Sequence, residues 1–296
     1  MDERLPRLKP DPLPEIRVTP ESLATGRLRE AYERTRAGLG VPWMGVVAMA
    51  FARYPAFYGT LWAAIEPIAP TRAFDDACSQ LRAVAEAEAA QLDPVPLLAD
   101  LKNDGYNAGD IAEIRACVEI FSAGNMPYLL MATLARLLLE GHRWPDGGEP
   151  GPLVEAPSPA PRPALMEPQH ADPTIRAVYD DIRRTLGLPF VNTDYRALAR
   201  WPSYFVRAWG GLAPVVGSEA YRAAVERLHY IAVDQALALP NLSALDPATL
   251  IEAADQDASR DEVLAVVRLF QWLLPGLITN VGWLRGQVRA REASRR

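Results

Sequence analysis

The sequence predicts an all-α protein made of two tandem homologous helical repeats, packed as a pseudo-dimer and joined by a long proline-rich linker. Three observations support this fold class. Segments rich in Ala, Leu, Glu and Arg place apolar residues at helical spacing. Alternating β-branched runs, which are typical of strands, are scarce. One long pattern of residues occurs twice in the same order.

The repeat is visible when REAYERTRAGLGVPW, starting at Arg29, is set against RAVYDDIRRTLGLPF, starting at Arg176. Arg, Tyr, Arg, Leu, Gly and Pro coincide at a constant offset of 147 positions. The register continues without a gap, so that Trp62 falls on Trp209. By Phe121 the offset has become 149, which indicates a small insertion or deletion. We interpret the pattern as a duplication.

The duplication defines the expected domain boundaries. They are an N-terminal extension at 1–24, a first helical repeat at 25–143, a proline-rich linker at 144–172 and a second helical repeat at 173–296. The segment WPDGGEPGPLVEAPSPAPRP has the composition of an extended tether without a core of its own. The basic tail RGQVRAREASRR is expected to be solvated surface.

Helical spacing predicts several longer helices, at residues 71–92, 105–123, 218–239 and 261–274. Ser218 is expected to cap the helix that follows it. Pro55 and Pro202 are expected to end or kink a helix, because the residue before a proline avoids the helical region.

Composition excludes several classes of protein. The net charge of -6 gives no reason to expect nucleic acid or an anionic membrane surface as a partner. No apolar run reaches the roughly 18–20 residues of a transmembrane helix, and the charged, proline-rich N-terminus lacks the apolar core of a secretory signal. Cys78 and Cys117 form no CxxC pair and are expected to be buried thiols in a reducing compartment. We therefore expect a soluble, cytoplasmic protein.

The familiar catalytic motifs do not occur: the sequence has no GxSxG, no P-loop, no GxGxxG after a strand and no HExxH. The histidines are isolated from one another. His142 and His170 border the linker, and His229 falls in a predicted helix, where a structural role is the common one. A Ser–His–Asp triad and a histidine-rich metal site are therefore not expected.

Asp194 is a polar residue present in only one repeat. Just after the shared Leu-Gly-x-Pro, it stands opposite Val47 of the first repeat. If Val47 faces the core, Asp194 faces the equivalent interior, where a lone carboxylate costs several kcal/mol unless it is hydrogen-bonded or contacts water. The alternative interpretation is that Asp194 is the N-cap of the following helix.

A second asymmetry lies in FSAGNMPYLLM, where Asn125 and Tyr128 stand opposite Leu274 and Leu277. Gly-Asn followed by Pro is expected to break or bend the helix, and a kink alone is one interpretation. The functional interpretation is a carboxamide that binds one water. Together, Asn125 and Asp194 form a plausible water-activating pair, with the carboxylate as general base.

Three segments, VPWMGVVAMAFARYPAFY, FSAGNMPYLLMATL and DYRALARWPSYF, resemble the group I 2-haloacid dehalogenases, the DehI family. The resemblance spans both halves, roughly residues 29–290. It implies hydrolytic removal of halide from short 2-haloalkanoic acids to give 2-hydroxy acids. It further implies that water attacks Cα directly with inversion, that no covalent ester forms, that no metal or organic cofactor is needed, and that the protein is a homodimer.

The resemblance also implies roles for individual residues. Asp194 matches the general base and Asn125 matches the group that orients the water. The positions that match the substrate-binding pocket are Trp43, Gly45, Val46, Tyr128, Asn192 and Thr193. Gly45, Val46 and Thr193 depart from the family pattern, which leaves substrate size and enantiomer preference open.

No arginine can be assigned to the substrate carboxylate. Arg53 and Arg200 occur in both repeats, which favours a structural role, so backbone N–H groups at helix starts are the expected ligands. Two other classes of protein were weighed. A small helical thiol peroxidase is argued against because a reactive cysteine pair is absent. A non-catalytic helical binding protein is the remaining alternative, since fold does not establish function.

Overall fold

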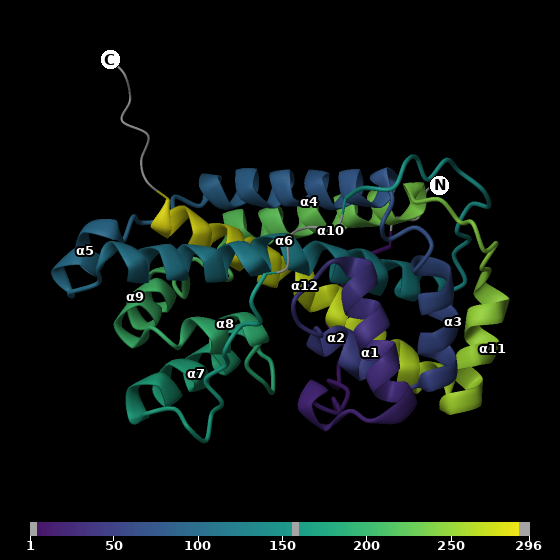
Figure 1. Ribbon diagram of the computed structural model, residues 1–296, viewed down its shortest axis with the longest axis horizontal. Coiled ribbons are helices and arrows are strands. Elements are labelled where there is room, and N and C mark those ends of the chain that lie inside the picture. Colours follow the sequence, from purple (N-terminus) through teal and green to yellow (C-terminus); the bar gives the residue numbers. More distant parts are fainter. Residues whose placement is uncertain (1–4, 156–159, 290–296) are drawn as a thin grey trace, which may run out of the picture. The chain divides into compact units, whose positions relative to one another are not determined.

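The computed structural model describes residues 5–155 and 160–289, and Figure 1 shows its helices. In these ranges the regular structure is helical, with isolated β-bridges and no β-strand. The first half contains η1 (Glu21–Leu23), α1 (Gly26–Leu39), α2 (Val46–Phe51), α3 (Pro55–Ile65), α4 (Arg72–Gln91), α5 (Leu98–Asn103) and α6 (Ala108–Leu139). The second half contains α7 (Pro173–Leu186), α8 (Thr193–Leu198), α9 (Pro202–Leu212), α10 (Glu219–Ala238), α11 (Pro247–Asp257) and α12 (Arg260–Val288). The all-α prediction is confirmed.

The bounds of the helices recur along the chain. Helices α1 to α4 reappear as α7 to α10, each shifted by 147 positions. The local backbone recurs with them: α1 and α7 both end at a left-handed glycine, Gly40 and Gly187, with φ of 63° and 62°. Pro55 and Pro202 are the first residues of α3 and α9, a position that needs no backbone N–H. Both prolines were expected to end or kink a helix. A helix boundary does lie at each, but the prolines begin α3 and α9 instead of ending a helix. Pseudo-dimer packing stays a prediction.

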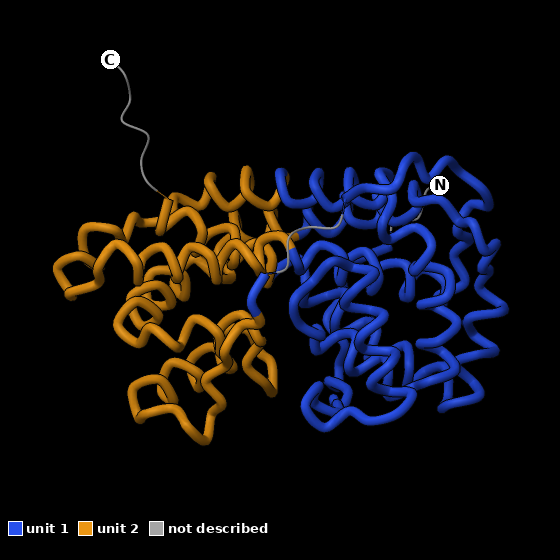
Figure 2. The backbone as a smooth tube through the Cα atoms, viewed as in Figure 1, with its two compact units in different colours: residues 1–83, 124–161, 226–276 blue, residues 84–123, 162–225, 277–296 orange. Residues whose placement is uncertain are grey.

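The chain divides into two compact units, coloured separately in Figure 2. Unit 1 contains residues 1–83, 124–161 and 226–276, and unit 2 contains residues 84–123, 162–225 and 277–296. Each unit therefore takes helices from both repeats. The expected domains are consecutive stretches of the sequence, whereas each compact unit combines three separate stretches.

In unit 1, α3 packs along α11, as Figure 1 shows. The backbone N–H of Phe57 donates to the Asp257 carboxylate over 2.9 Å, which satisfies a free N–H group in the first turn of α3. The ring of Phe51 packs edge-on against Phe57 and Phe270. Phe51 comes from the first repeat and Phe270 from the second, so the core of unit 1 depends on both.

A chain of buried polar groups fastens the N-terminal segment to unit 1. The Nε2 atom of His229 lies 2.7 Å from the Leu5 carbonyl, and its Nδ1 atom lies 2.9 Å from Nε2 of Gln271. Arg136 donates from Nη1 to Oε1 of Gln271 and to the Pro6 carbonyl, both at 2.8 Å. His229 is thus a structural histidine with both ring nitrogens in contact with partners, as expected.

In unit 2, α7 and α8 pack against α9. The Tyr195 ring of α8 meets Trp209 edge-on at 5.7 Å between centroids, and Tyr179 of α7 meets Phe205 at 6.0 Å. Such edge-to-face pairs add to the free energy of apolar burial. Helix α8, only six residues long, is therefore fixed by its aromatic contacts rather than by its own length.

The Gly-Asn-x-Pro segment was expected to break or bend its helix. Helix α6 runs without interruption through Pro127, so the break is wrong, while a bend stays a prediction. A proline removes only one backbone hydrogen bond of the helix and crowds the preceding turn. Nearly every residue from Gly124 to Leu139 is buried, and this apolar packing offsets the loss. Helix α12 likewise continues through Pro275 and reaches Val288. The basic tail accordingly begins inside α12, and its residues 290–296 lie outside the described ranges.

Helix α12 is also the one helix in the described ranges that is long and apolar enough to cross a membrane, which the sequence analysis did not expect. In the fold, 78% of its most apolar window is buried, as in a core helix.

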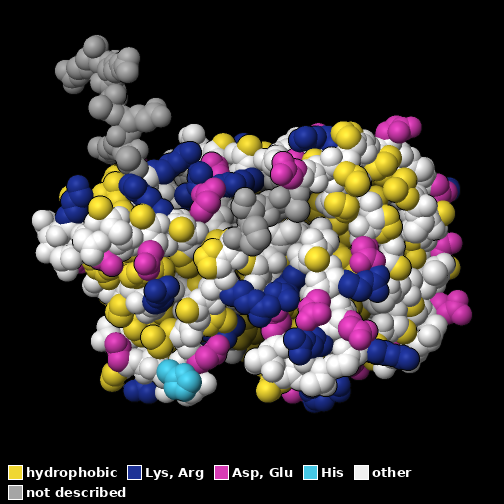
Figure 3. Space-filling view, viewed as in Figure 1, with side chains coloured by type: hydrophobic (Ala, Val, Ile, Leu, Met, Phe, Trp, Pro, Cys, Tyr) yellow, Lys and Arg dark blue, Asp and Glu magenta, His cyan; other side chains and the backbone are white. Residues whose placement is uncertain are grey.

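On the surface view of Figure 3, basic and acidic side chains are interspersed across the face shown.

The start of the linker is fastened to unit 1 instead of forming a free tether. Trp144 is 1% exposed, and its indole N–H donates to the Leu239 carbonyl over 2.8 Å. The backbone N–H of Asn241 donates to the Gly147 carbonyl over 2.8 Å. The proline-rich residues 156–159 lie outside the described ranges. Glycines at positive φ and prolines let this segment follow the surface without regular structure.

Candidate functional site

Four of the predicted pocket residues lie in unit 1, in or beside the loop at residues 41–45, which joins α1 to α2 and is held by Tyr128. The Tyr128 hydroxyl donates to the Trp43 carbonyl and accepts from the Gly45 backbone N–H, each over 2.8 Å. The Trp43 and Tyr128 rings lie 6.0 Å apart. The structure therefore brings together three of the predicted pocket residues.

Two glycines allow this close packing. A Cβ atom on Gly124 would lie 2.3 Å from the Trp43 ring, and one on Gly45 would lie 2.8 Å from the Tyr128 ring. Real side chains do not approach so closely, so only glycine fits at either position. The Trp43 ring consequently lies directly on α6, at the residue before Asn125. Asn125 itself is buried, one turn before Tyr128 on the same helix.

Three other predicted residues lie in unit 2, at the start of α8. Asn192 is the N-cap residue of α8, and Thr193 and Asp194 begin the helix. The interpretation of Asp194 as the N-cap is therefore wrong, because Asn192 occupies that position and the helix starts two residues earlier than that role requires. Asp194 is 3% exposed and lies in the first helical turn, where the helix dipole favours a negative charge.

Further contacts fasten α8 within unit 2. Asn280 of α12 donates from Nδ2 to the Tyr195 hydroxyl over 2.9 Å. Arg196 contacts both carboxylate oxygens of Glu167 at 2.8 and 2.9 Å, and its carbonyl accepts from the Met166 backbone N–H at 2.9 Å. The residues on both sides of Asp194 in the chain are buried, which limits how far its carboxylate can move.

The electric field of Asp194 acts on its neighbours. Burial, and then the charge of Asp194, raise the pKa of the Cys117 thiol to about 12. Burial also raises the pKa of Tyr195 well above its ordinary value, with the Asp194 charge contributing in the same direction. Cys117 is therefore protonated at neutral pH and is not a nucleophile. Cys78 is also a free thiol, and burial raises its pKa.

The structure says less about the remaining predicted residues, Asn192 and Val46, and about the pairing of Asp194 with Asn125. Asn192 is buried, and its Oδ1 atom has no hydrogen-bond partner in the described structure. Val46 is only partly buried. Asp194 and Asn125 belong to different compact units, so their pairing around one water stays a prediction. In the described residues, no three His, Cys, Asp or Glu side chains are grouped as metal ligands.

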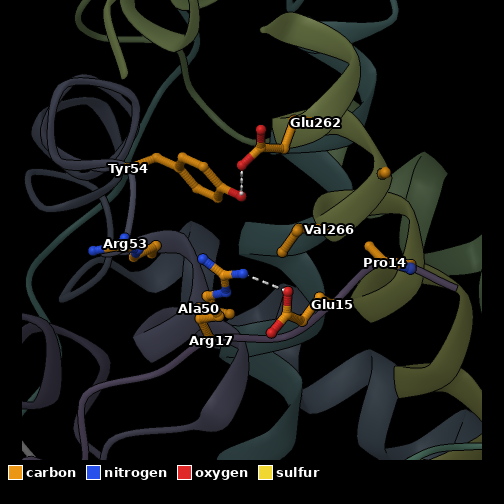
Figure 4. Close-up of a pocket in the computed structure, with 9 residues that line it drawn as sticks. Pro14, Glu15, Arg17, Ala50, Arg53, Tyr54, Glu262 and Val266 are labelled. Atoms are coloured by element: carbon orange, nitrogen blue, oxygen red, sulfur yellow. Dashed lines mark hydrogen bonds and ion pairs between the residues drawn. The ribbon is translucent and has the colours of Figure 1, made fainter. Parts of the chain in front are cut away.

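A separate cavity of about 370 Å³ lies in unit 1 between the N-terminal segment, α2 and α12 (Figure 4). Arg17 is ion-paired with Glu15, and Tyr54 donates a hydrogen bond to Glu262. Arg53 also lines this cavity, while Arg200 contacts Glu113 at 3.4 Å. None of the predicted catalytic or pocket residues lines this cavity, so it is not the candidate site.

Comparisons with known proteins identify the family. The family model described as halocarboxylic acid dehydrogenase DehI matches residues 42–195. An (R)-2-haloacid dehalogenase of Rhizobium sp. (strain NHG3) is 47% identical, over 80% of this chain and 93% of its own. An (R)-2-haloacid dehalogenase of Pseudomonas putida is 36% identical over 92% of both chains. A configuration-inverting 2-haloacid dehalogenase of Pseudomonas sp. (strain 113) is 26% identical over 71% of this chain.

Solved structures agree with the sequence relatives. A complex of D-2-haloacid dehalogenase with L-LA has a TM-score of 0.89 and 35% identity, covering 97% of this chain and all of that one. A D-2-haloacid dehalogenase mutant with D-2-CPA has a TM-score of 0.88 and 34% identity, covering 97% and 99%. The alternatives of a thiol peroxidase and of a non-catalytic binding protein are therefore set aside. The chain belongs to the DehI family of 2-haloacid dehalogenases and is an enzyme that dehalogenates 2-haloacids by hydrolysis.

Proposed function

We propose that Asp194 activates a water that displaces halide from Cα of the substrate. The Asp194 carboxylate takes a proton while the water oxygen bonds to Cα, and the halide leaves with the electron pair of the carbon–halogen bond. Attack opposite the leaving group inverts the carbon. Asn125 orients the water through its carboxamide. The observation that supports this most directly is the burial of Asp194 on a short helix fixed on both sides.

We propose short 2-haloalkanoic acids as substrates, with preference for the (R) enantiomer. The support is that the two relatives named for (R)-2-haloacids are much more similar to this chain than the relatives named without that specificity. We propose Trp43, Gly45, Val46, Tyr128, Asn192 and Thr193 as the substrate-binding residues. A cytoplasmic location and a homodimer stay predictions.

The substrate carboxylate would then need backbone donors. The loop before α2 offers few, because the Gly45 N–H is bound to Tyr128 and the Met44 N–H is bound to Glu21. We therefore propose that the carboxylate binds N–H groups in the first turn of a helix, because these groups have no partner within the helix.

Asp194→Asn tests the proposal in a halide-release assay with separate (R)- and (S)-2-chloropropionate. We expect the parent to release halide and the variant to lose at least about 100-fold in kcat, the low end for a lost general base. Asp180→Asn, on the exposed side of α7, is the matched control and should keep full activity. An Asp194→Asn variant as active as the parent would remove Asp194 from the mechanism.

Single-turnover reaction in isotope-labelled water tests direct attack. Label should enter the 2-hydroxy acid in the first turnover. Label found first in an enzyme carboxylate would instead show an aspartyl ester intermediate, and the water-attack mechanism would be wrong.

A further inference from the structure

The N-terminal extension contacts the loop that carries Trp43 and Gly45. The Tyr32 hydroxyl of α1 donates to the Thr19 carbonyl over 2.9 Å and holds the extension against α1. The repeat-equivalent bond exists in unit 2, where the Tyr179 hydroxyl donates to the Met166 carbonyl over 2.7 Å. Residues 19–24 are therefore the structural counterpart of residues 166–171, and they belong to the fold of the first repeat.

Glu21 lies in this segment and has two partners in unit 1. Its Oε2 atom accepts a hydrogen bond from the Met44 backbone N–H over 2.9 Å. Its Oε1 atom is 3.1 Å from Nε of Arg36, in an ion pair whose side chains are only 22% and 18% exposed. A charged acceptor in such a sheltered place makes a stronger hydrogen bond than a neutral one in water.

The Met44 N–H stands between the two groups that Tyr128 holds. The Trp43 carbonyl before it and the Gly45 N–H after it both bind the Tyr128 hydroxyl. Successive backbone groups of the loop are thus fixed by two side chains, Tyr128 from α6 and Glu21 from the extension. If Glu21 is lost, the Met44 N–H loses this side-chain partner, while Tyr128 still binds the groups on either side of it.

Glu21 is present in only one repeat, as Asp194 and Asn125 are. Its counterpart by the constant offset is Pro168, which has no carboxylate. The counterpart of Arg36 is Arg183, which pairs with Asp180 of its own helix. In the second repeat the neighbouring Glu167 supplies the carboxylate of this segment, and it binds the Arg196 side chain of α8. In the first repeat the carboxylate of Glu21 binds a backbone N–H of the loop that carries Trp43.

We propose that Glu21 is a positioning residue for the dehalogenation site: it fixes the Trp43–Gly45 wall of the pocket without touching the reacting atoms. This inference rests on the proposed function. A wall displaced by about 1 Å can cost on the order of 100-fold in rate or affinity when the substrate must be held for in-line attack.

Substitutions that remove one partner at a time test the role. Glu21→Ala removes both contacts and should raise KM for the preferred 2-chloropropionate about tenfold. Glu21→Gln keeps an oxygen acceptor for Met44 and should stay within about threefold of the parent. Glu33→Ala, an exposed ion-paired carboxylate on α1, is the matched control and should have no effect on KM. All are assayed well below their melting temperatures.

The pH profile of kcat/KM separates positioning from proton transfer, because it reports the pKa values of the essential groups. In Glu21→Ala the pH profile should keep the shape of the parent's profile, and only its maximal kcat/KM should be lower. A KM unchanged in Glu21→Ala would overturn the inference, and so would a shifted pH limb, which would make Glu21 a catalytic base. If Glu21→Ala does not fold, a Glu21→Gln variant as impaired as Asp194→Asn also overturns it. An active Asp194→Asn variant would instead overturn the proposed function.

Discussion

The Tyr128 hydroxyl has a single proton, and that proton is donated to the Trp43 carbonyl. Tyr128 therefore cannot also donate a hydrogen bond to a substrate while the loop keeps this conformation. Burial raises the pKa of Tyr128, so the phenol stays protonated across the physiological range. We therefore expect Tyr128 to contribute shape to the proposed pocket, because its hydroxyl fixes the backbone of the loop that carries Trp43 and Gly45.

His229 predicts how stability depends on pH. Burial lowers its pKa from the ordinary 6.5 to about 4, because the charged imidazolium is disfavoured among apolar groups. The unfolded chain therefore binds a proton that the folded chain excludes. Stability from this residue is fully present above pH 6.5 and is lost as the pH falls toward 4. The total loss is about 3 kcal/mol.

Urea unfolding at about pH 7 and about pH 4.5 measures this loss. His229→Gln, whose side-chain amide does not titrate, should lose less stability between the two pH values than the parent does. His170→Gln, at an exposed histidine, is the control and should behave as the parent. Equal pH dependence in the parent and in His229→Gln would contradict the assignment.

At the scale of the elements, the meeting of α6 with the 41–45 loop depends on a helical glycine. Gly124→Ala should destabilise the protein by about 1–3 kcal/mol, since the added Cβ would overlap the Trp43 ring and force it to move. It should also lower kcat/KM, because Asn125 and Trp43 are the groups displaced.

Gly59→Ala is the matched control for this substitution. Gly59 lies in α3, where an added Cβ would meet nothing within 4 Å, so alanine should stabilise the helix by about 0.5–1 kcal/mol. Thermal unfolding followed by circular dichroism compares the two variants. Equal melting temperatures would show that the Trp43 ring adapts freely to the added methyl group.

Helix boundaries were predictable from the sequence where they depend on residues close together in the chain. A helix boundary was expected at Pro55 and Pro202 because the residue before a proline avoids the helical region, although the sequence did not show that the prolines begin the next helix. The N-cap bond of Ser218, which accepts from the Tyr221 N–H over 3.1 Å, needs only residues three apart. Predicted helices ended too early at Ala123 and Leu274, because Pro127 and Pro275 look like breaks when tertiary packing is unknown. Both α6 and α12 continue past the proline because the second half of each helix is largely buried.

The candidate site was predictable only in part. The asymmetry between the repeats identified Asp194, Asn125 and Tyr128, because a lone polar group stands out against an apolar mate. It missed Glu21, since residues 19–24 and 166–171 share almost no sequence and their equivalence appears only in the structure. The partner of Glu21 is moreover a backbone N–H 23 positions away, and side-chain patterns do not reveal such a group.

At the scale of the whole molecule, each compact unit is built from both repeats. Neither half of the chain should therefore fold alone. Residues 1–155 lack α11 and the start of α12, which complete unit 1, and residues 160–296 lack the portions of α4 to α6 that complete unit 2. Each fragment would expose apolar surface that the other half buries.

Expression of the two fragments separately and together tests this expectation. Each fragment alone should show no cooperative thermal transition and no halide release. The co-expressed pair should recover both properties, because the two fragments together amount to the full chain with one cut in the linker. A cooperative transition in either isolated fragment would contradict the interdependence of the repeats.

Each compact unit is assembled from segments far apart in the sequence, and the ribosome makes these segments at different times. The last residues of unit 1 are 226–276, so this unit cannot be completed until most of the polypeptide has left the ribosome. The early helix α3 must wait for α11, its packing partner, which is made almost 200 positions later. Contacts between such distant positions slow folding and leave apolar faces open to aggregation in the meantime. A protein of this fold thus depends on protection of its nascent chain more than its modest size would suggest.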